Sequence, residues 1–153
     1  MADIVDQQTR SRMMSGIRAK DTKGELLIRS GLHELGFRFR LHATNLPGTP
    51  DLVLPRFRAA IFVHGCFWHG HDCHLFKMPS TRREFWQAKI ARNVDRDCGV
   101  RASLCEAGWR RLVIWECALK GKHRLGREAL MRRVSQWIVG RSEEGEIEGL
   151  RSV

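Results

Sequence analysis

Long apolar segments are absent from this sequence. No stretch approaches the roughly 18 consecutive apolar residues that a membrane-spanning helix requires, and the N-terminal letters MADIVDQQTRSRMM contain no apolar signal-peptide core. These absences exclude a spanning helix and argue against secretion. We therefore expect a cytoplasmic protein that has no membrane partner.

Acidic residues are scarce relative to basic ones. Lys and Arg number 27 against 17 Asp and Glu, which gives a formal net charge of +10. The basic residues are spread from Arg10 to Arg133 and do not form a tail or a basic amphipathic helix, so a nucleic acid is favoured over a membrane surface as the partner. The alternative is a solvated basic surface kept for solubility, and the salt dependence of binding separates the two.

The length of 153 residues, 42% of them apolar, suits one domain with a hydrophobic core and is too short for two. Residues 1–20 are polar and basic without sustained periodicity, which indicates a DNA-binding arm. We expect the folded domain to cover residues 21–139. The acidic, glycine-containing residues 140–153 have the composition of a disordered tail.

Apolar periodicity predicts the secondary structure. The helices are expected over residues 22–35, 81–107 and 124–139, and the strands over residues 37–41, 51–54, 59–63 and 109–115. Residues 22–25 and 81–84 each fit a capping box, and the second helix has an alternative break near Asn93 or Gly99. Because short loops join the first three strands and helices lead to the last, the pattern predicts an α/β domain with a mixed sheet flanked by helices.

The five cysteines are an odd number, and in a reducing compartment a Cys/His group indicates a metal site or catalysis more often than disulfides. Residues 64–79 lack periodicity, which predicts a long irregular loop that a metal holds. The spacing C-x4-H-x-C places Cys66, His71 and Cys73 in this loop, and Cys117 follows the last strand. Three thiolates and one imidazole suit a closed tetrahedral zinc site, which is structural and not hydrolytic.

Alternatives exist for each cysteine. His69 and His74 compete with His71 for the histidine position, and the cysteines of the cluster are also consistent with ordinary buried thiols. Cys98 and Cys105 differ because they lie about 10 Å apart along one face of the predicted helix. That separation is too long for a disulfide, so we expect both to pack in the core.

A second group of side chains indicates phosphodiester hydrolysis. Asp51 opens one strand and His64 ends the next, so hairpin-like pairing brings both near His69 in the following loop. Mg²⁺ prefers carboxylate ligands, and an imidazole can accept a proton from water near neutral pH. Glu25, at the start of the first helix, is the one acid that we place near them. The alternatives are a turn-forming Asp51 and a Glu25 that only closes its own capping box.

An adjacent aromatic pair, Phe67 and Trp68, lies in the irregular loop, where both side chains are hard to bury. Apolar side chains can enter a base stack and open it, at a lower cost where the base pair is already mismatched. We expect this pair to bind DNA in that way, with Met14 of the arm entering from the opposite groove. The alternative is a lid over the cysteine loop.

Four short motifs carry a resemblance to a known family. They are T-R-S near the start, L-P-G-x-P-D at 46–51, H-G-C-F-W-H at 64–69 and W-E-C-A-L at 115–119. On these motifs the chain resembles the very short patch repair endonucleases over nearly its whole length. The resemblance implies a restriction-endonuclease-like core and an enzyme that nicks one strand 5′ to the thymine of T:G mispairs, which arise by deamination of 5-methylcytosine. It also implies mismatch-repair proteins as neighbours, and we expect a monomer.

The resemblance assigns roles to the candidate residues. It implies that Asp51 binds Mg²⁺ and that His69 is the general base. His64 and Glu25 would support the active site. The remaining roles concern zinc and DNA: the zinc ligands would be Cys66, His71, Cys73 and Cys117, and the side chains inserted into DNA would be Phe67, Trp68 and Met14.

The chain departs from the family pattern around Val63. The acid-x-lysine motif of the wider nuclease superfamily is absent, because Phe62-Val63-His64 occupies that stretch, so metal binding there must use water and the Val63 carbonyl. Relatives often carry a hydroxyl residue at this position, and valine removes that polar contact. We still expect activity. Two other functions stay open, namely a non-catalytic zinc-containing DNA-binding module and a restriction-type endonuclease that cuts matched duplex.

Overall fold

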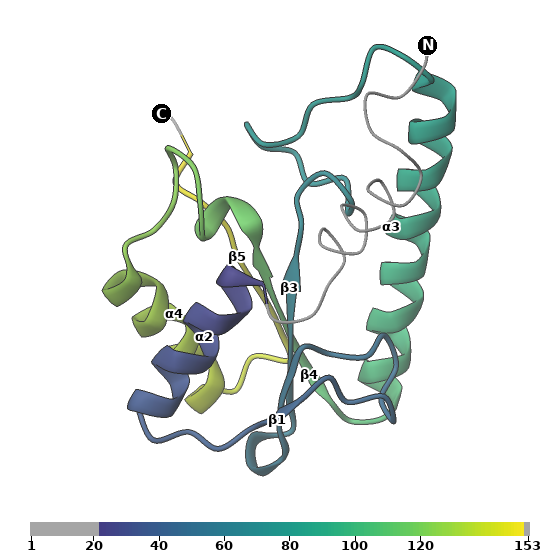
Figure 1. The fold of residues 1–153 in the computed structure, drawn as a ribbon. Coiled ribbons are helices and arrows are strands. Elements are labelled where there is room, and N and C mark those ends of the chain that lie inside the picture. The colour runs from purple at the N-terminus through teal and green to yellow at the C-terminus, as the bar shows by residue number, and fades with distance from the viewer. Residues whose placement is uncertain (1–21, 152–153) are drawn as a thin grey trace, which may run out of the picture.

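A five-stranded mixed sheet forms the centre of the computed structural model, which describes residues 22–151 (Figure 1). The strands follow the order β1-β2-β3-β4-β5, with the bounds Arg40–Leu41, Leu52–Leu54, Ala59–His64, Arg110–Trp115 and Glu144–Ile147. Strands β1 to β3 are antiparallel, whereas β3, β4 and β5 run parallel. The prediction of an α/β fold with a mixed sheet is confirmed. The expected arm over residues 1–20, with Met14, lies outside the described residues.

Helices cover both faces of this sheet. Helices α2 (Lys23–Glu34) and α4 (Arg127–Val139) pack on one face, and the long helix α3 (Arg83–Glu106) lies against the other, as Figure 1 shows. Side chains of β3 alternate between the two layers, so Ile61 joins the core under α2 and α4, whereas Phe62 joins the core under α3. His64 follows Phe62 in this alternation and projects toward α3. In the part of the chain that the structure describes, no helix is both long and apolar enough to span a membrane.

The two predicted capping boxes have different outcomes. At the start of α2 the Thr22 hydroxyl accepts a hydrogen bond of 3.2 Å from the backbone N–H of Glu25, as predicted. At the start of α3 the box over residues 81–84 is not used, because Arg82 occupies the N-cap position in a left-handed conformation with φ 54°. The chain therefore enters α3 one residue later than the sequence pattern predicts.

One alternative and one expectation about α3 are wrong. The helix is continuous over its 24 residues, so there is no break near Asn93 or Gly99. Cys98 and Cys105 are exposed and do not pack in the core. The reason is that α3 meets the sheet along a narrow stripe and turns the rest of its circumference to solvent. The buried residues of α3 are Ile90 and Leu104.

The expectation of a disordered tail over residues 140–153 is wrong for its central part. Residues Glu144–Ile147 form strand β5, which pairs in parallel with β4 so that Ile147 lies opposite Ile114. Ile147 is only 4% exposed. An edge strand needs few apolar residues, because backbone hydrogen bonds to its neighbour supply much of its order. The acidic composition therefore did not reveal it.

Candidate active site and metal cluster

One cavity gathers most of the residues expected to act in hydrolysis. Its volume is about 270 Å³, and its walls include Asp51, Val63, His64 and His69. The antiparallel register of β2 and β3 explains this meeting, because it sets the start of β2 beside the end of β3. The backbone N–H of Val63 donates a hydrogen bond of 2.7 Å to the Asp51 carboxylate. The structure thus brings the carboxylate and the two imidazoles to one place.

The Asp51 carboxyl is electrostatically unusual. Burial raises its pKa from 3.8 to about 7, the hydrogen bond from Val63 opposes this rise, and the negative charge of Glu25 adds to it. Glu25 is itself only 5% exposed. Two neighbouring buried carboxylates repel each other unless a proton or a cation lies between them. The pair therefore has the character of a cation site.

His42, which the sequence analysis missed, completes a group with Glu25 and Asp51. One ligand atom from each of the three residues lies within 4.8 Å of the others. The backbone N–H of His42 donates to the Asp51 carbonyl at 3.1 Å, and Arg29 contacts both the Glu25 carboxylate and the His42 ring. His42 lies just after β1 in a segment without periodicity, so no sequence signal pointed to it.

A second missed residue, Asp97 of α3, holds the imidazole of His69. The distance from His69 Nδ1 to Asp97 Oδ2 is 2.6 Å. The His69 ring also stacks on the His64 ring, with centroids 3.7 Å apart and an interplanar angle of 1°. A sequence signal for Asp97 did exist, because it lies seven residues from both Ile90 and Leu104, on the stripe of α3 that faces the sheet. A carboxylate on an otherwise apolar stripe indicates a buried polar partner.

The pKa values of both ionisable neighbours of His69, His64 and Asp97, are lowered, with opposite consequences for their charge. Burial, followed by the charge of His69, lowers the pKa of His64 from 6.5 to about 3. The His64 Nδ1 atom is buried and has no hydrogen-bond partner among residues 22–151. Burial raises the pKa of Asp97, but the hydrogen bond and charge of His69 outweigh it, so the pKa lies below its ordinary value. At neutral pH, therefore, His64 is uncharged and Asp97 is ionised.

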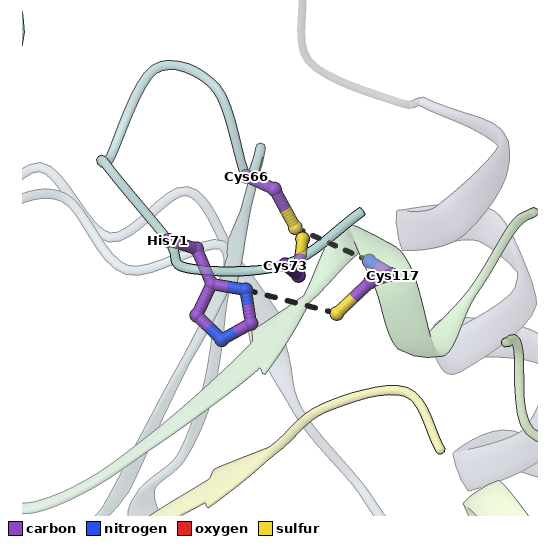
Figure 2. A group of neighbouring side chains, drawn as sticks. All are labelled: Cys66, His71, Cys73 and Cys117. Carbon is purple, nitrogen blue, oxygen red and sulfur yellow. Dashed lines mark hydrogen bonds between the residues drawn. The ribbon is translucent and has the colours of Figure 1, made fainter. Parts of the chain in front are cut away.

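The cysteine loop and the residues after β4 form a compact cluster, drawn in Figure 2. Its members, whose ligand atoms all lie within 4.8 Å of one another, are Cys66, His71, Cys73 and Cys117. The Cys117 sulfur lies 3.7 Å from His71 Nδ1, and the Cys117 backbone N–H donates to the Cys66 sulfur at 3.3 Å. Of the three competing histidines, the structure places His71 in this cluster. His69 belongs to the cavity, and His74 packs edge-on against His123.

The chemistry of this donor set fits a thiophilic cation. Burial raises the pKa of the Cys66 and Cys117 thiols, so without a positive charge they stay protonated. A bound Zn²⁺ would stabilise the thiolate forms, and three sulfurs with one nitrogen match its preferred tetrahedral set. Cys66 and Cys117 are buried, so the cluster ties the end of β3 to the end of β4 from inside the molecule.

The comparison with known proteins decides the family. Residues 2–75 match the family described as DNA mismatch endonuclease Vsr. The chain is 47% identical to the DNA mismatch endonuclease Vsr of Escherichia coli (strain K12), over 97% of this chain and 95% of that protein. The chain belongs to the Vsr family of DNA endonucleases. The resemblance inferred from the short motifs is confirmed.

The chain is also similar over most of its length to two type II nicking enzymes. The type II nicking enzyme V.XorIIP of Xanthomonas oryzae is 44% identical over 88% of this chain and 97% of its own length. The type II nicking enzyme V.NmeAIP of Neisseria meningitidis is 40% identical over 89% of this chain and 96% of its own length. At this coverage the similarities span both the cavity around Asp51 and the cysteine cluster.

The aromatic pair of this Vsr-family chain stands at the N-terminal end of α3. The rings of Phe67 and Trp68 stack with centroids 5.2 Å apart, and each meets the Trp86 ring edge-on, at 5.6 and 5.8 Å. Asn93 anchors the loop by donating to the Trp68 carbonyl at 2.9 Å. Both side chains of the pair are half-buried. The two rings are therefore already stacked on each other, and part of each ring is exposed to solvent, where a ligand could contact it.

Proposed function

We propose that this chain is a Mg²⁺-dependent DNA endonuclease that nicks one strand 5′ to the thymine of a T:G mispair. The observation that carries the proposal is the cavity in which Asp51, Val63 and His69 meet in a member of the Vsr family. The restriction-endonuclease-like core is part of the same proposal, and the mixed sheet with helices on both faces is compatible with it.

Asp51 and the Val63 carbonyl would hold the magnesium ion. The residues fit such an ion, because Asp51 is a buried carboxylate beside a second carboxylate, Glu25, and lacks a compensating charge strong enough to keep its pKa low. When bound, Mg²⁺ stabilises negative charge on the phosphate and orients a water molecule. Glu25 and His42 would order the water that surrounds the ion.

His69 would act as the general base. A carboxylate only accepts hydrogen bonds, so the ionised Asp97 fixes the His69 proton on Nδ1 and leaves the Nε2 lone pair free to take a proton from water. Asp97 also stabilises the imidazolium that results. His64 remains neutral, and its flat stack on His69 holds the plane of the reacting ring.

Basic residues in the same cavity would bind the DNA phosphate. Arg96 and Arg111 line it together with Asp51 and His69. Burial lowers the pKa of the Arg111 guanidinium, which shows that this cation is partly withdrawn from water. A phosphate that enters the cavity would therefore meet the partly buried Arg111 in an environment of reduced dielectric, where the attraction is stronger than at the surface, and the exposed Arg96 at its rim.

The other components of the proposal follow from the cysteine cluster and the aromatic pair. Zn²⁺ on Cys66, His71, Cys73 and Cys117 would be structural. Phe67 and Trp68, with Met14 of the arm, would insert into the DNA at the mispair, where opening the base stack costs least. We further propose a monomeric, cytoplasmic enzyme that works beside mismatch-repair proteins.

Strand-resolved nicking tests this function. Duplexes that share all flanking bases and differ only in a central T:G, T:A or C:G pair are incubated with the protein in Mg²⁺ or in EDTA. We expect nicking of the thymine strand of the T:G duplex in Mg²⁺ alone, and its loss in Asp51→Asn with DNA binding retained. Equal cutting of the T:A duplex would indicate a restriction-type enzyme. Binding without cleavage under every condition would indicate a non-catalytic DNA-binding module.

A further inference from the structure

The segment that follows β5 runs directly against the cysteine cluster. Glu148 Oε2 lies 2.8 Å from His71 Nε2, the backbone N–H of Gly149 donates to the Cys117 sulfur at 3.3 Å, and the backbone N–H of Leu150 donates to the His123 carbonyl at 2.7 Å. Three consecutive residues thus contact the cluster or its immediate support. This part of the chain joins the cluster although 30 residues lie between Cys117 and Glu148.

The contact with Glu148 determines how His71 faces the sulfurs. Arg151 holds the Glu148 carboxylate with hydrogen bonds of 2.8 and 3.1 Å. Since a carboxylate accepts and does not donate, the His71 proton resides on Nε2, and the lone pair of Nδ1 is free. Figure 2 shows Nδ1 directed at the Cys117 sulfur, with the other ring nitrogen directed away from the sulfurs. A metal-bound histidine typically has such a partner on its second nitrogen.

The close approach of Gly149 is an independent sign that this segment fits the cluster. A Cβ atom added at Gly149 would lie 2.5 Å from the Cys117 carbonyl oxygen and 2.7 Å from the His123 carbonyl oxygen. Both obstacles are backbone atoms, so they cannot rotate away as the end of a side chain would. Any side chain at this position therefore pushes the segment off the cluster and removes the N–H to sulfur hydrogen bond.

We propose that Glu148 and Gly149 are positioning residues of the metal site, so that Zn²⁺ binding and docking of the C-terminal segment stabilise each other. The proposal rests on the assignment of the cluster as a zinc site. Docking orients His71 and supplies an N–H donor to the Cys117 thiolate, which favours the metal-bound form. Binding of the metal fixes His71 and Cys117, which are the groups that the segment contacts. Thermodynamic linkage requires these two effects to be equal in free energy.

Zinc affinity gives the first test. The full-length protein is titrated with Zn²⁺ against a zinc-binding dye, and the affinity is compared between the wild type and its variants. We expect Glu148→Ala to lower the affinity about 10- to 100-fold. Glu148→Gln should lose less, because its amide oxygen still accepts the His71 proton. The matched control is Glu143→Ala, which removes an exposed carboxylate just before β5, away from the cluster.

Substitutions of glycine provide a second comparison that leaves every ligand and carboxylate in place. Gly149→Ala should lower zinc affinity, whereas Gly126→Ala should not, because beyond its two chain neighbours no described residue lies within 4 Å of a Cβ added at Gly126. Hydrogen exchange of residues 144–151 supplies the reciprocal measurement. We expect removal of zinc to increase exchange in this segment of the wild type, and to have a smaller effect in Glu148→Ala, where exchange is already fast.

The outcomes separate this inference from the proposals on which it depends. Wild-type zinc affinity in both Glu148→Ala and Gly149→Ala, or exchange of residues 144–151 that ignores zinc, would overturn the coupling. A wild-type chain that binds no zinc would overturn the coupling together with the zinc site. Because affinity and exchange are measured without DNA, a zinc-loaded protein that fails to nick T:G duplexes would refute the proposed function and leave a measured coupling standing.

Discussion

The carboxylate of Asp97 accepts a hydrogen bond from the imidazole of His69 across 2.6 Å, and this contact joins helix α3 to the loop after β3. Serine hydrolases use the same relationship between a carboxylate and a catalytic histidine to fix the tautomer of the base. In this protein the carboxylate lies on the most regular element of the fold, a helix of 24 residues. The position of the His69 ring therefore depends on the packing of α3 against the sheet.

Substitution Asp97→Asn should slow nicking by about 10²- to 10⁴-fold, the range that general acid–base groups contribute. The asparagine has nearly the same shape as aspartate, but its amide N–H can donate to His69 Nδ1. That favours the tautomer with the proton on Nε2, which cannot accept a proton from water at that atom. Single-turnover nicking of a T:G duplex at saturating enzyme measures the rate without a contribution from binding. Asp95→Asn, an exposed residue of the same helix, is the control and should retain the wild-type rate. Equal rates in both variants would exclude a role for Asp97 in the reaction.

The stability of the metal-free protein should respond to pH through two opposing groups. The folded-state pKa of Asp51 is raised from 3.8 to about 7, so the stability that its proton confers is present below pH 3.8 and is lost as pH rises toward 7. The folded-state pKa of His64 is lowered from 6.5 to about 3, so stability is lost as pH falls from 6.5 toward 3. Between pH 3.8 and 6.5 the two contributions partly cancel.

Substitution of either residue should reveal the pH dependence of stability that the other residue causes. In EDTA, we expect the Tm of Asp51→Asn to rise with pH between about 4 and 6.5 more steeply than that of the wild type, and the Tm of His64→Gln to fall over the same range. Thermal unfolding at half-unit intervals of pH measures both. Parallel curves for the three proteins would mean that neither group is perturbed in the folded state.

Zinc removal should destabilise the fold and leave the catalytic residues chemically intact. A zinc concentration 1,000 times the Kd contributes about 4 kcal/mol to the free energy of unfolding, which corresponds to roughly 10 °C in Tm for a chain of this size. We expect EDTA, or the substitution Cys66→Ala, to lower the Tm by that order. Cys98→Ala, which changes an exposed cysteine of α3, should leave both the Tm and its response to EDTA unchanged. An EDTA-insensitive wild type would exclude a structural metal.

Substitutions in the aromatic pair should reduce discrimination between T:G and T:A duplexes. Phe67→Ala removes the ring that stacks on Trp68 and meets Trp86 edge-on, so the protein loses part of the aromatic surface that would replace lost stacking between bases. Contacts between bases and aromatic rings contribute about 1–3 kcal/mol each, so T:G affinity should fall by about 5- to 150-fold while T:A affinity changes little. Competition binding measures both affinities, and Phe37→Ala, on the other side of the sheet, is the control. A uniform loss for both duplexes would contradict the insertion mechanism.

The sequence predicts the elements and site residues that have a local signal, and misses those that depend on the folded arrangement. Apolar periodicity locates α2 and a continuous apolar run locates β3, because each pattern reflects burial of the element's own side chains. The capping box marks the start of α2 through a local hydrogen bond. His42 belongs to the site only because the β1 turn crosses its edge, which no local pattern encodes. The position of Asp97 on the stripe of α3 that faces the sheet is a local signal, but its partner His69 is set by the packing of α3. Strand β5 was missed for the same reason, since its order comes from β4.

Because β5 follows the other described strands in the sequence and pairs with β4, this edge of β4 stays open during synthesis until residues 144–147 have left the ribosome. Until then β4, whose residues from Leu112 to Trp115 are all buried in the finished fold, presents an unpaired apolar edge to the cell. Such an edge attracts other strands and invites aggregation during synthesis. A chain cut before Glu144 would thus need handling by chaperones and proteases, although every proposed metal ligand and catalytic side chain precedes that residue.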